Sequence, residues 1–269
     1  MLDFNNFSYS LIQRINRFKP RKFHAYCIGA AKTGTTSVAS MFKDSYRARH
    51  EQEVEKTNRL VIDLLEGKID NDKLSQFLKE RDRRLNLEME SSHPLGYLSN
   101  YLATLFPNSL FIITVREPLS WLKSRLNFHY KVHPKAWNEY RDYFWTQRNG
   151  SYNPEEKLLE NYGLCSLDVY LSQYADHYRR VLEGVPEERR LIVRTSEIIE
   201  KIPDMAKFLG ANPKKIVGAH MKRSENKITP LDEIDENYVK GRIFYHCESL
   251  INQFFPEKLL LYKNNNTVN

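Results

Sequence analysis

The stretch that decides the fold is Phe23–Ser37, which reads FHAYCIGAAKTGTTS. Its first residues, Phe23–Gly29, are apolar and rich in strand formers, and they predict a buried β-strand. A loop of small residues follows, and a helix is expected through Val38–Phe42. Small residues let backbone N–H groups approach an anion, and the start of a helix adds a favourable dipole. The stretch therefore predicts a phosphate-binding loop between a strand and a helix.

This loop departs from the P-loop of nucleoside triphosphatases in two ways. In the pattern GxxxxGK[ST], the position of the lysine is taken by Thr35, and the lysine lies inside the loop as Lys32. The buried strand predicted at Ser109–Val115 ends in Arg116 rather than in an aspartate that would hold Mg²⁺. Such a loop suits a donor with less charge than ATP, and a P-loop-type kinase is kept as an alternative.

The composition is that of one globular domain with an anionic partner. The chain has 269 residues, of which 41% are hydrophobic, and only 10 glycines and 11 prolines. The net charge of +7 favours nucleotides, acidic glycans or anionic lipids as partners. Three cysteines without a CxxC pair argue against a structural zinc site and fit a reducing, cytoplasmic compartment. We find no apolar run that suits a signal peptide or a membrane span.

Strands alternate with helices along the chain. Further strands are predicted at Ser45–Ala48, Leu85–Glu90, Ser109–Val115 and Arg190–Val193. Further helices are predicted as a pair within Glu53–Arg84, then at Pro94–Phe106, Pro118–His129, Trp137–Arg148 and Leu167–Glu183, and through Phe208. This alternation predicts an α/β fold, P-loop-like, with three α/β/α layers and a central parallel sheet. The loops Ala30–Ser37 and Arg116–Pro118 are then expected at the same edge of that sheet.

The domain is expected to cover residues 23–263, with a different segment at each end. In residues 1–22, apolar side chains recur at steps of three and four, which predicts an amphipathic helix with a basic end. This helix either packs on the domain or lies on the inner face of an anionic membrane, and both alternatives stay open. The tail, residues 264–269, is expected to be disordered.

Two motifs follow predicted strands at the expected ligand edge. The first is KTGTT, Lys32–Thr36, and the second is Arg116-Glu117-Pro118 with Ser124 eight residues after the arginine. In sequence and in order they resemble the signatures of the sulfotransferases that use 3′-phosphoadenosine-5′-phosphosulfate (PAPS). A weaker likeness is Phe208-Leu209-Gly210, whereas Thr195-Ser196-Glu197 replaces the family's usual Tyr-Glu-Asp. The resemblance covers roughly residues 23 to 260.

The resemblance implies transfer of a sulfuryl group from PAPS, release of adenosine 3′,5′-bisphosphate (PAP), and no metal. Lys32 would contact the oxygen that bridges phosphate and sulfate and stabilise the charge that forms there. Arg116 and Ser124 would hold the 3′-phosphate. The 5′-phosphate would be held by Thr33, Gly34, Thr35, Thr36 and Ser37. Lys222 and Arg223 would close over the nucleotide, although they equally suit a solvated charged surface.

Members of the family that use a glutamate as base, including tyrosylprotein and bacterial carbohydrate sulfotransferases, place it just after the second strand. Glu51 is therefore the first candidate for removing the acceptor's proton, followed by Glu53 and His50. In an extended chain His50 would point away from Glu51. A carboxylate in a pocket that excludes water is also expected to have a raised pKa.

The acceptor side is predicted from two further stretches. The candidates are Glu90, Ser91, His93, His129 and Tyr130. Residues 91–94 also suit a plain helix start, and the aromatic residues Trp137, Tyr140 and Phe144 are expected in the core. The acceptor is expected to be a glycan or glycolipid, and no nucleic-acid partner is expected. A polyanion-binding module without catalysis is the alternative from another class.

Overall fold

The computed structural model describes residues 19–130, 134–148, 150–218 and 228–263. The helix expected at the N-terminus, the expected tail, and Lys222 and Arg223 lie outside the described residues, apart from residues 19–22. The strands are β1 (Ala25–Cys27), β2 (Ala48–His50), β3 (Met89–Ser91), β4 (Leu110–Val115) and β5 (Arg190–Arg194). They form one parallel sheet in the order β2-β3-β1-β4-β5.

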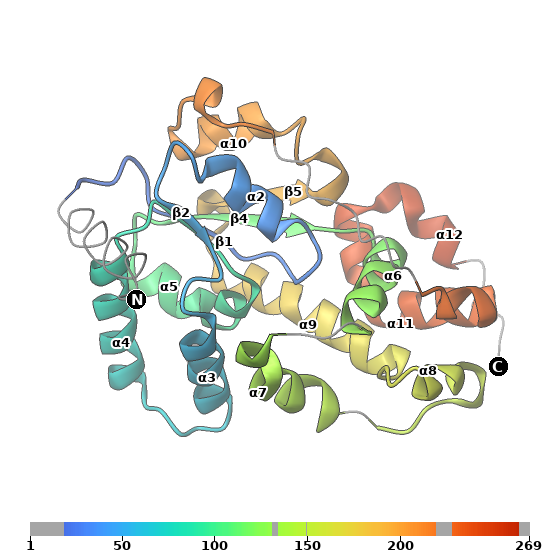
Figure 1. The fold of residues 1–269 in the computed structure, drawn as a ribbon. Helices are drawn as coiled ribbons and strands as arrows, with labels where there is room; N and C mark the ends of the chain where they lie inside the picture. The colour runs from blue at the N-terminus through green and yellow to red at the C-terminus, as the bar shows by residue number, and fades with distance from the viewer. Residues whose placement is uncertain (1–18, 131–133, 149, 219–227, 264–269) are drawn as a thin grey trace, which may run out of the picture.

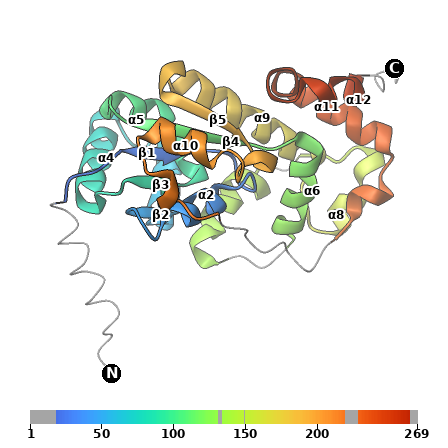
Figure 2. The ribbon, with the colours of Figure 1, turned by 90° about the horizontal axis from the view of Figure 1, so that it is seen from above.

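Helices cover both faces of the sheet (Figures 1 and 2). One face packs against α2 (Thr35–Phe42) and α10 (Ile202–Leu209), and the other against α5 (Ser99–Leu105) and α9 (Leu167–Gly184). The central strands have both faces buried, which explains why their sequences are nearly continuous apolar runs. The predicted three-layer α/β/α fold with a central parallel sheet is confirmed.

The remaining elements surround these layers. The helices are α3 (Val54–Leu65), α4 (Asn71–Leu85), α6 (Pro118–His129), α7 (Asn138–Arg141), α8 (Leu158–Asn161), α11 (Glu236–Phe254) and α12 (Leu259–Lys263). Short 3-10 or π-helical segments are η1 (His93–Leu98), η2 (Lys135–Trp137), η3 (Asp142–Thr146), η4 (Pro154–Glu156), η5 (Glu187–Arg189), η6 (Thr195–Glu197), η7 (Pro213–Lys215), η8 (Pro230–Glu233) and η9 (Pro256–Lys258). Within the described ranges, no helix is long and apolar enough to cross a membrane.

Two strands begin later in the chain than the sequence predicts. The second strand was expected at Ser45–Ala48, but the turn that ends α2 continues through Tyr46, whose N–H donates to the carbonyl of Phe42. Strand β2 therefore pairs with β3 only from Ala48 onward. Similarly, the strand expected from Leu85 starts at Met89, because α4 runs to Leu85. The two strands end at His50 and Ser91, so the next residues lie at the ligand edge.

Candidate functional site

The loops that follow the strands meet at the carboxyl edge of the sheet, as the sequence predicts. The phosphate loop follows β1, Glu51 follows β2, and His93 lies just beyond β3. Arg116 follows β4, and Thr195 follows β5. Because all strands are parallel, five segments that are distant in sequence supply one edge.

The inner side of the phosphate loop is bonded to the protein itself. The Thr33 hydroxyl is buried, donates to the carbonyl of Ala30 (2.6 Å) and lies 2.8 Å from the Thr114 hydroxyl. Thr195 donates to the carbonyl of Thr33 (2.6 Å), and the Trp121 indole donates to the carbonyl of Ala31 (2.9 Å). Thr33 is thus a poor fit to the role expected from the sequence, because its side chain faces the core and holds the loop's shape.

The turn into α2 requires unusual backbone angles. Gly34 has φ 101°, which favours glycine, and a Cβ there would overlap the side chain of Ile198. Lys32 also has a positive φ, 70°. Its ammonium lies 4.6 Å from the centre of the Phe128 ring. Non-glycine residues are rarely left-handed, and those that are cluster at functional sites. Glu51, with φ 52°, is another non-glycine residue of this site with a left-handed backbone.

The hydroxyls of Thr35 and Thr36 lie 3.4 and 3.1 Å from Nε2 of His50. Ser37, half-buried, follows in the first turn of α2. The structure therefore brings these loop residues and the end of β2 together. The start of α2 holds no acidic residue, which leaves its N–H groups suited to an anion.

Arg116 lies directly against the phosphate loop. Its guanidinium donates to the carbonyl of Lys32 (3.3 Å) and to the hydroxyl of Ser120 (2.9 Å). Glu117 caps α6 by accepting from two backbone N–H groups and also bonds Tyr262, so its carboxylate has partners other than Arg116. Ser124 is half-buried, one turn beyond Ser120. Ser120 was not predicted, although its spacing of four residues from Arg116 was visible in the sequence.

Glu51 forms a small cluster with two histidines. Its carboxylate lies 3.3 Å from Nδ1 of His93 and 3.6 Å from Nδ1 of His50. The expectation that His50 points away from Glu51 is wrong. The left-handed backbone at Glu51 ends the extended conformation, which is why the two side chains meet. The imidazole of His93 also stacks on Trp137, with ring centres 5.1 Å apart and an interplanar angle of 9°.

The protonation of this cluster also differs from the expectation. Burial alone would raise the pKa of Glu51, but the hydrogen bond and charge of His93 and the charge of His50 outweigh it. The pKa of Glu51 is therefore lowered rather than raised. Burial lowers the pKa of both His93 and His50, against the opposite effect of Glu51. At neutral pH the cluster consists of a carboxylate beside neutral imidazoles.

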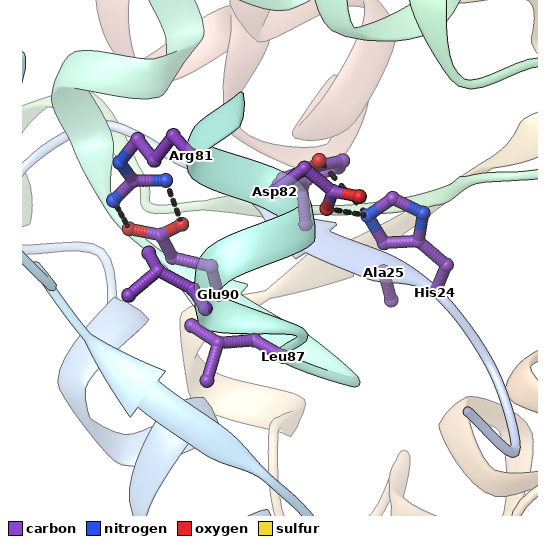
Figure 3. A pocket seen from close by; sticks show the side chains of 8 residues that line it. His24, Ala25, Arg81, Asp82, Leu87 and Glu90 are labelled. Atoms are coloured by element: carbon purple, nitrogen blue, oxygen red, sulfur yellow. Dashed lines mark hydrogen bonds and ion pairs between the residues drawn. The ribbon is translucent and has the colours of Figure 1, made fainter. Parts of the chain in front are cut away.

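Two other predicted carboxylates are used in ion pairs. Glu90 is 3% exposed and both its oxygens bond Arg81, at 2.6 and 2.5 Å (Figure 3). Glu53 bonds Arg84 through both oxygens, at 2.7 and 2.8 Å. The Ser91 hydroxyl, which is buried, donates to the carbonyl of Thr35 (2.7 Å). These three side chains are occupied by bonds within the protein and are therefore poorly placed to act as a base or to contact an acceptor.

The two acceptor candidates at the end of α6, His129 and Tyr130, lie in different surroundings. His129 is buried and its Nδ1 bonds the Tyr170 hydroxyl, whereas Tyr130 is 54% exposed and packs against Tyr162. Tyr130 is therefore not brought together with the Glu51 cluster by any contact of the described residues. Tyr140 and Phe144 are buried, as expected, while Trp137 is half-buried.

Sequence reasoning missed Arg125, on α6. It is 5% exposed, and its guanidinium lies 4.3 Å from the centre of the Trp145 ring and 5.7 Å from that of Phe128. The signal was present, because Arg125 interrupts the buried stripe that Trp121 and His129 mark on this helix. A charged residue on the buried face of a helix is unusual unless it is paired.

Comparison with known proteins identifies the family. Residues 26–227 match a family model described as a sulfotransferase domain, and no curated protein sequence matches. Among solved structures, a sulfotransferase from Mycobacterium avium is similar at TM-score 0.54 and 11% identity, with 92% of this chain and 81% of that chain covered. A sulfotransferase from Alicyclobacillus acidocaldarius gives TM-score 0.46 at 15% identity, with 90% and 96% covered. The structural likeness bears on the fold, and the family match extends over most of the sheet and its loops. The chain therefore belongs to the sulfotransferase family.

Proposed function

We propose that this chain transfers the sulfuryl group of PAPS to a hydroxyl of a glycan or glycolipid. The observation that carries the proposal is the contact between Arg116 and the phosphate loop, 3.3 Å from guanidinium to the carbonyl of Lys32. It brings the two motifs side by side, as a single anion-binding surface would require. PAPS carries one phosphate at each end of its ribose, so a donor site needs two anion-binding groups close together.

Each end of the donor has its own residues in this proposal. The 5′-phosphate is held by backbone N–H groups of the loop and by Thr35, Thr36 and Ser37 at the start of α2. The 3′-phosphate is held by Arg116, with Ser120 and Ser124 as hydroxyl donors on the adjoining helix. Thr33 contributes by fixing the loop's shape.

Lys32 is assigned to the leaving group. As the bond between sulfur and the bridging oxygen breaks, negative charge collects on that oxygen, and a nearby ammonium stabilises it. The ammonium is held over the Phe128 ring at 4.6 Å, an attraction weak enough to be exchanged for a phosphate oxygen.

Glu51 is assigned as the base. It accepts the acceptor's hydroxyl proton while the acceptor oxygen forms its bond to sulfur and PAP departs. Glu53 and Glu90 are held in bidentate ion pairs, whereas Glu51 is held by the imidazoles of His93 and His50. The flat stack of His93 on Trp137 borders this carboxylate and suits the face of a sugar ring, which supports a glycan acceptor.

Thermal unfolding with nucleotides tests the donor assignment. PAP should raise the unfolding midpoint, because a ligand that binds only the folded state stabilises it by mass action. Adenosine 5′-phosphate should do much less, since it offers no 3′-phosphate to Arg116. Equal stabilisation by the two nucleotides would contradict the assignment.

Turnover measurements separate this proposal from the kinase alternative. With PAPS and a panel of glycans and glycolipids, mass spectrometry should detect a sulfated product. EDTA should leave the rate unchanged, because no step assigned above uses a metal. Activity with ATP that is lost in EDTA and restored by Mg²⁺ would favour the kinase instead.

A further inference from the structure

Arg125 is a buried cation that no carboxylate of the described residues compensates. Its Nε is buried and has no hydrogen-bond partner among the described residues. The ionisable neighbours with the largest effects on its pKa are Tyr170, Tyr140, Arg141 and Cys165. Burial raises the pKa of both tyrosines and that of Cys165, the latter to about 11, so these groups are neutral at neutral pH. An uncompensated buried charge is strongly unfavourable in an isolated protein.

Two more N–H donors without an acceptor belong to the same cluster. Arg125 lies 4.3 Å from the centre of the Trp145 ring, and within the described part of the chain neither the buried indole Nε1 of Trp145 nor the buried Nε of Arg141 has a hydrogen-bond partner. Most buried N–H groups in proteins are hydrogen-bonded, so three unsatisfied donors in one cluster require an explanation. All three are donors and two carry positive charge, which is the chemistry that binds an oxyanion.

The cluster adjoins the proposed reaction site. Arg125 and Lys32 share the Phe128 ring, with their cationic groups 5.7 and 4.6 Å from its centre. The positive charge of Arg125 also reaches His93, whose imidazole lies beside Glu51. Arg125 therefore lies near both the proposed leaving-group lysine and the proposed base, at the opposite end of α6 from Arg116.

We propose that Arg125, with Arg141 and Trp145, binds an anionic group of the acceptor, either a carboxylate, a sulfate or a phosphate. The acceptor is then an acidic glycan or glycolipid rather than a neutral one. The assignment of this anion to the acceptor rests on the sulfotransferase function proposed above, whereas the existence of an oxyanion pocket does not. The ligand's negative charge would offset the positive charge of Arg125. A neutral acceptor would leave this buried charge uncompensated, which gives selectivity for an anionic acceptor.

The pocket is tested with inorganic sulfate on protein saturated with PAP, so that the donor's phosphate sites are occupied. The unfolding midpoint should rise with sulfate in a saturable way that sodium chloride of equal ionic strength does not reproduce. Sulfate also stabilises proteins generally by exclusion from their surface, but that effect does not saturate. Arg125→Met, a neutral side chain of similar length, should lose the saturable part.

Arg148→Met is the matched control, because Arg148 also lies over aromatic rings, at 4.9 Å from Tyr143 and 5.0 Å from Phe144, but is exposed. It should keep the full sulfate response. Both variants should bind PAP within about twofold of the original chain, which also shows that they are folded. A saturable response that persists in Arg125→Met, or none in the original chain, overturns the pocket.

Two further results separate the possible sources of the anion and the two proposals. If Arg125→Met weakens PAP binding about tenfold, the arginine serves the donor and the acceptor assignment is wrong. If the original chain does not bind PAP but keeps a saturable, Arg125-dependent sulfate response, the donor proposal fails while the pocket stands. For the best acceptor of the panel, methyl esterification of its acidic group should lower kcat/KM about tenfold, and a neutral best acceptor overturns the inference.

Discussion

The donor side and the acceptor side of this site are built in different ways. On the donor side, Thr33, Thr195 and Arg116 bond polar groups of the phosphate loop, so the loop has a defined shape without its ligand. On the acceptor side, Glu51 contacts neighbouring histidines, and Arg125 rests on aromatic rings. Under the proposed function, a loop with a fixed shape suits a donor whose two phosphates have fixed positions. On the proposed acceptor side, Glu51 has partners within the chain, whereas Arg125 has no carboxylate within ion-pair distance among the described residues.

A third region, the ion pair between Arg81 on α4 and Glu90 on β3, resembles neither side. There Arg81 bonds Glu90 through two hydrogen bonds (Figure 3). Arg81 also donates to the carbonyl of Gln52 (2.6 Å), which precedes α3. This pair is compensated within the chain. We therefore expect the ionic groups of this molecule to divide into those that stabilise the fold and those that bind a ligand, and mutations can separate the two.

The largest expected effect is on the free energy of unfolding and concerns the ion pair of Arg81 and Glu90. Glu90→Gln removes one charge of a buried ion pair and leaves Arg81, whose side chain is 7% exposed, with only the longer ionic contact to Glu53 at 3.6 Å. Loss of one member of such a pair lowers the free energy of unfolding by about 3–5 kcal/mol. Chemical denaturation measures it. Asp176→Asn, which breaks an exposed pair with Arg179, is the control and should change stability by about 1 kcal/mol at most. A Glu90→Gln protein as stable as the original would contradict the division.

The next effect falls on chemistry at the donor side. Lys32→Ala should lower kcat by about 10²–10³-fold, because the leaving oxygen gains its charge only as the bond to sulfur breaks. PAP binding should change far less, since the loop's shape depends on Thr33 and Gly34. Single-turnover rates at saturating PAPS, with PAP affinity from calorimetry, measure both quantities. A variant with normal turnover and weak PAP affinity would make Lys32 a binding residue only.

The variant Glu51→Gln tests the base proposed on the acceptor side. It should lower turnover by about 10²-fold, the low end for a lost general base, and leave PAP binding intact. Glu53→Gln should lower turnover less, because Glu53 is paired with Arg84. If Glu51→Gln turns over normally while His50→Ala does not, the base is His50; lost turnover in Glu90→Gln would identify Glu90 as the base only if that variant is also shown to be folded.

The pH dependence follows from the sign of the shift at Glu51. Its pKa in the folded protein is below the ordinary value of 4.5, so the carboxylate is ionised throughout the neutral range. Turnover should therefore show no loss attributable to this group until the pH falls below about 4.5. The same ionisation stabilises the fold above that pH, and this contribution is lost as the pH falls through the lowered pKa. A turnover profile that declines already near pH 6 would point to a histidine.

The sequence predicts the donor side well because its signals are local. A strand, a loop of small residues and a helix are contiguous in Phe23–Phe42, and the Arg116 motif follows a buried strand directly. The acceptor side depends on contacts between distant segments. Nothing local shows that Glu90 meets Arg81 or that the left-handed backbone at Glu51 turns it toward His50. Burial of Arg125 likewise depends on Trp145, which lies in another segment.

The smallest expected effect concerns Phe128, the ring that Lys32 and Arg125 share. The ring is 39% exposed and lies 4.6 Å from the ammonium of Lys32, so it attracts the lysine through a cation–π contact. A cation–π contact at such exposure contributes about 0.5–1 kcal/mol, and Phe128→Leu should therefore change kcat/KM for PAPS by roughly two- to fivefold. The control is Tyr130→Leu, which removes a more exposed aromatic ring two residues further along, at the C-terminal end of α6, and should change kcat/KM less.

If the ring only covers Arg125, Phe128→Leu should instead alter the saturable sulfate response and leave kcat/KM for PAPS unchanged. Measuring both quantities on the same variant thus decides which of the two cations the ring serves, and so whether it belongs to the donor side or to the acceptor side.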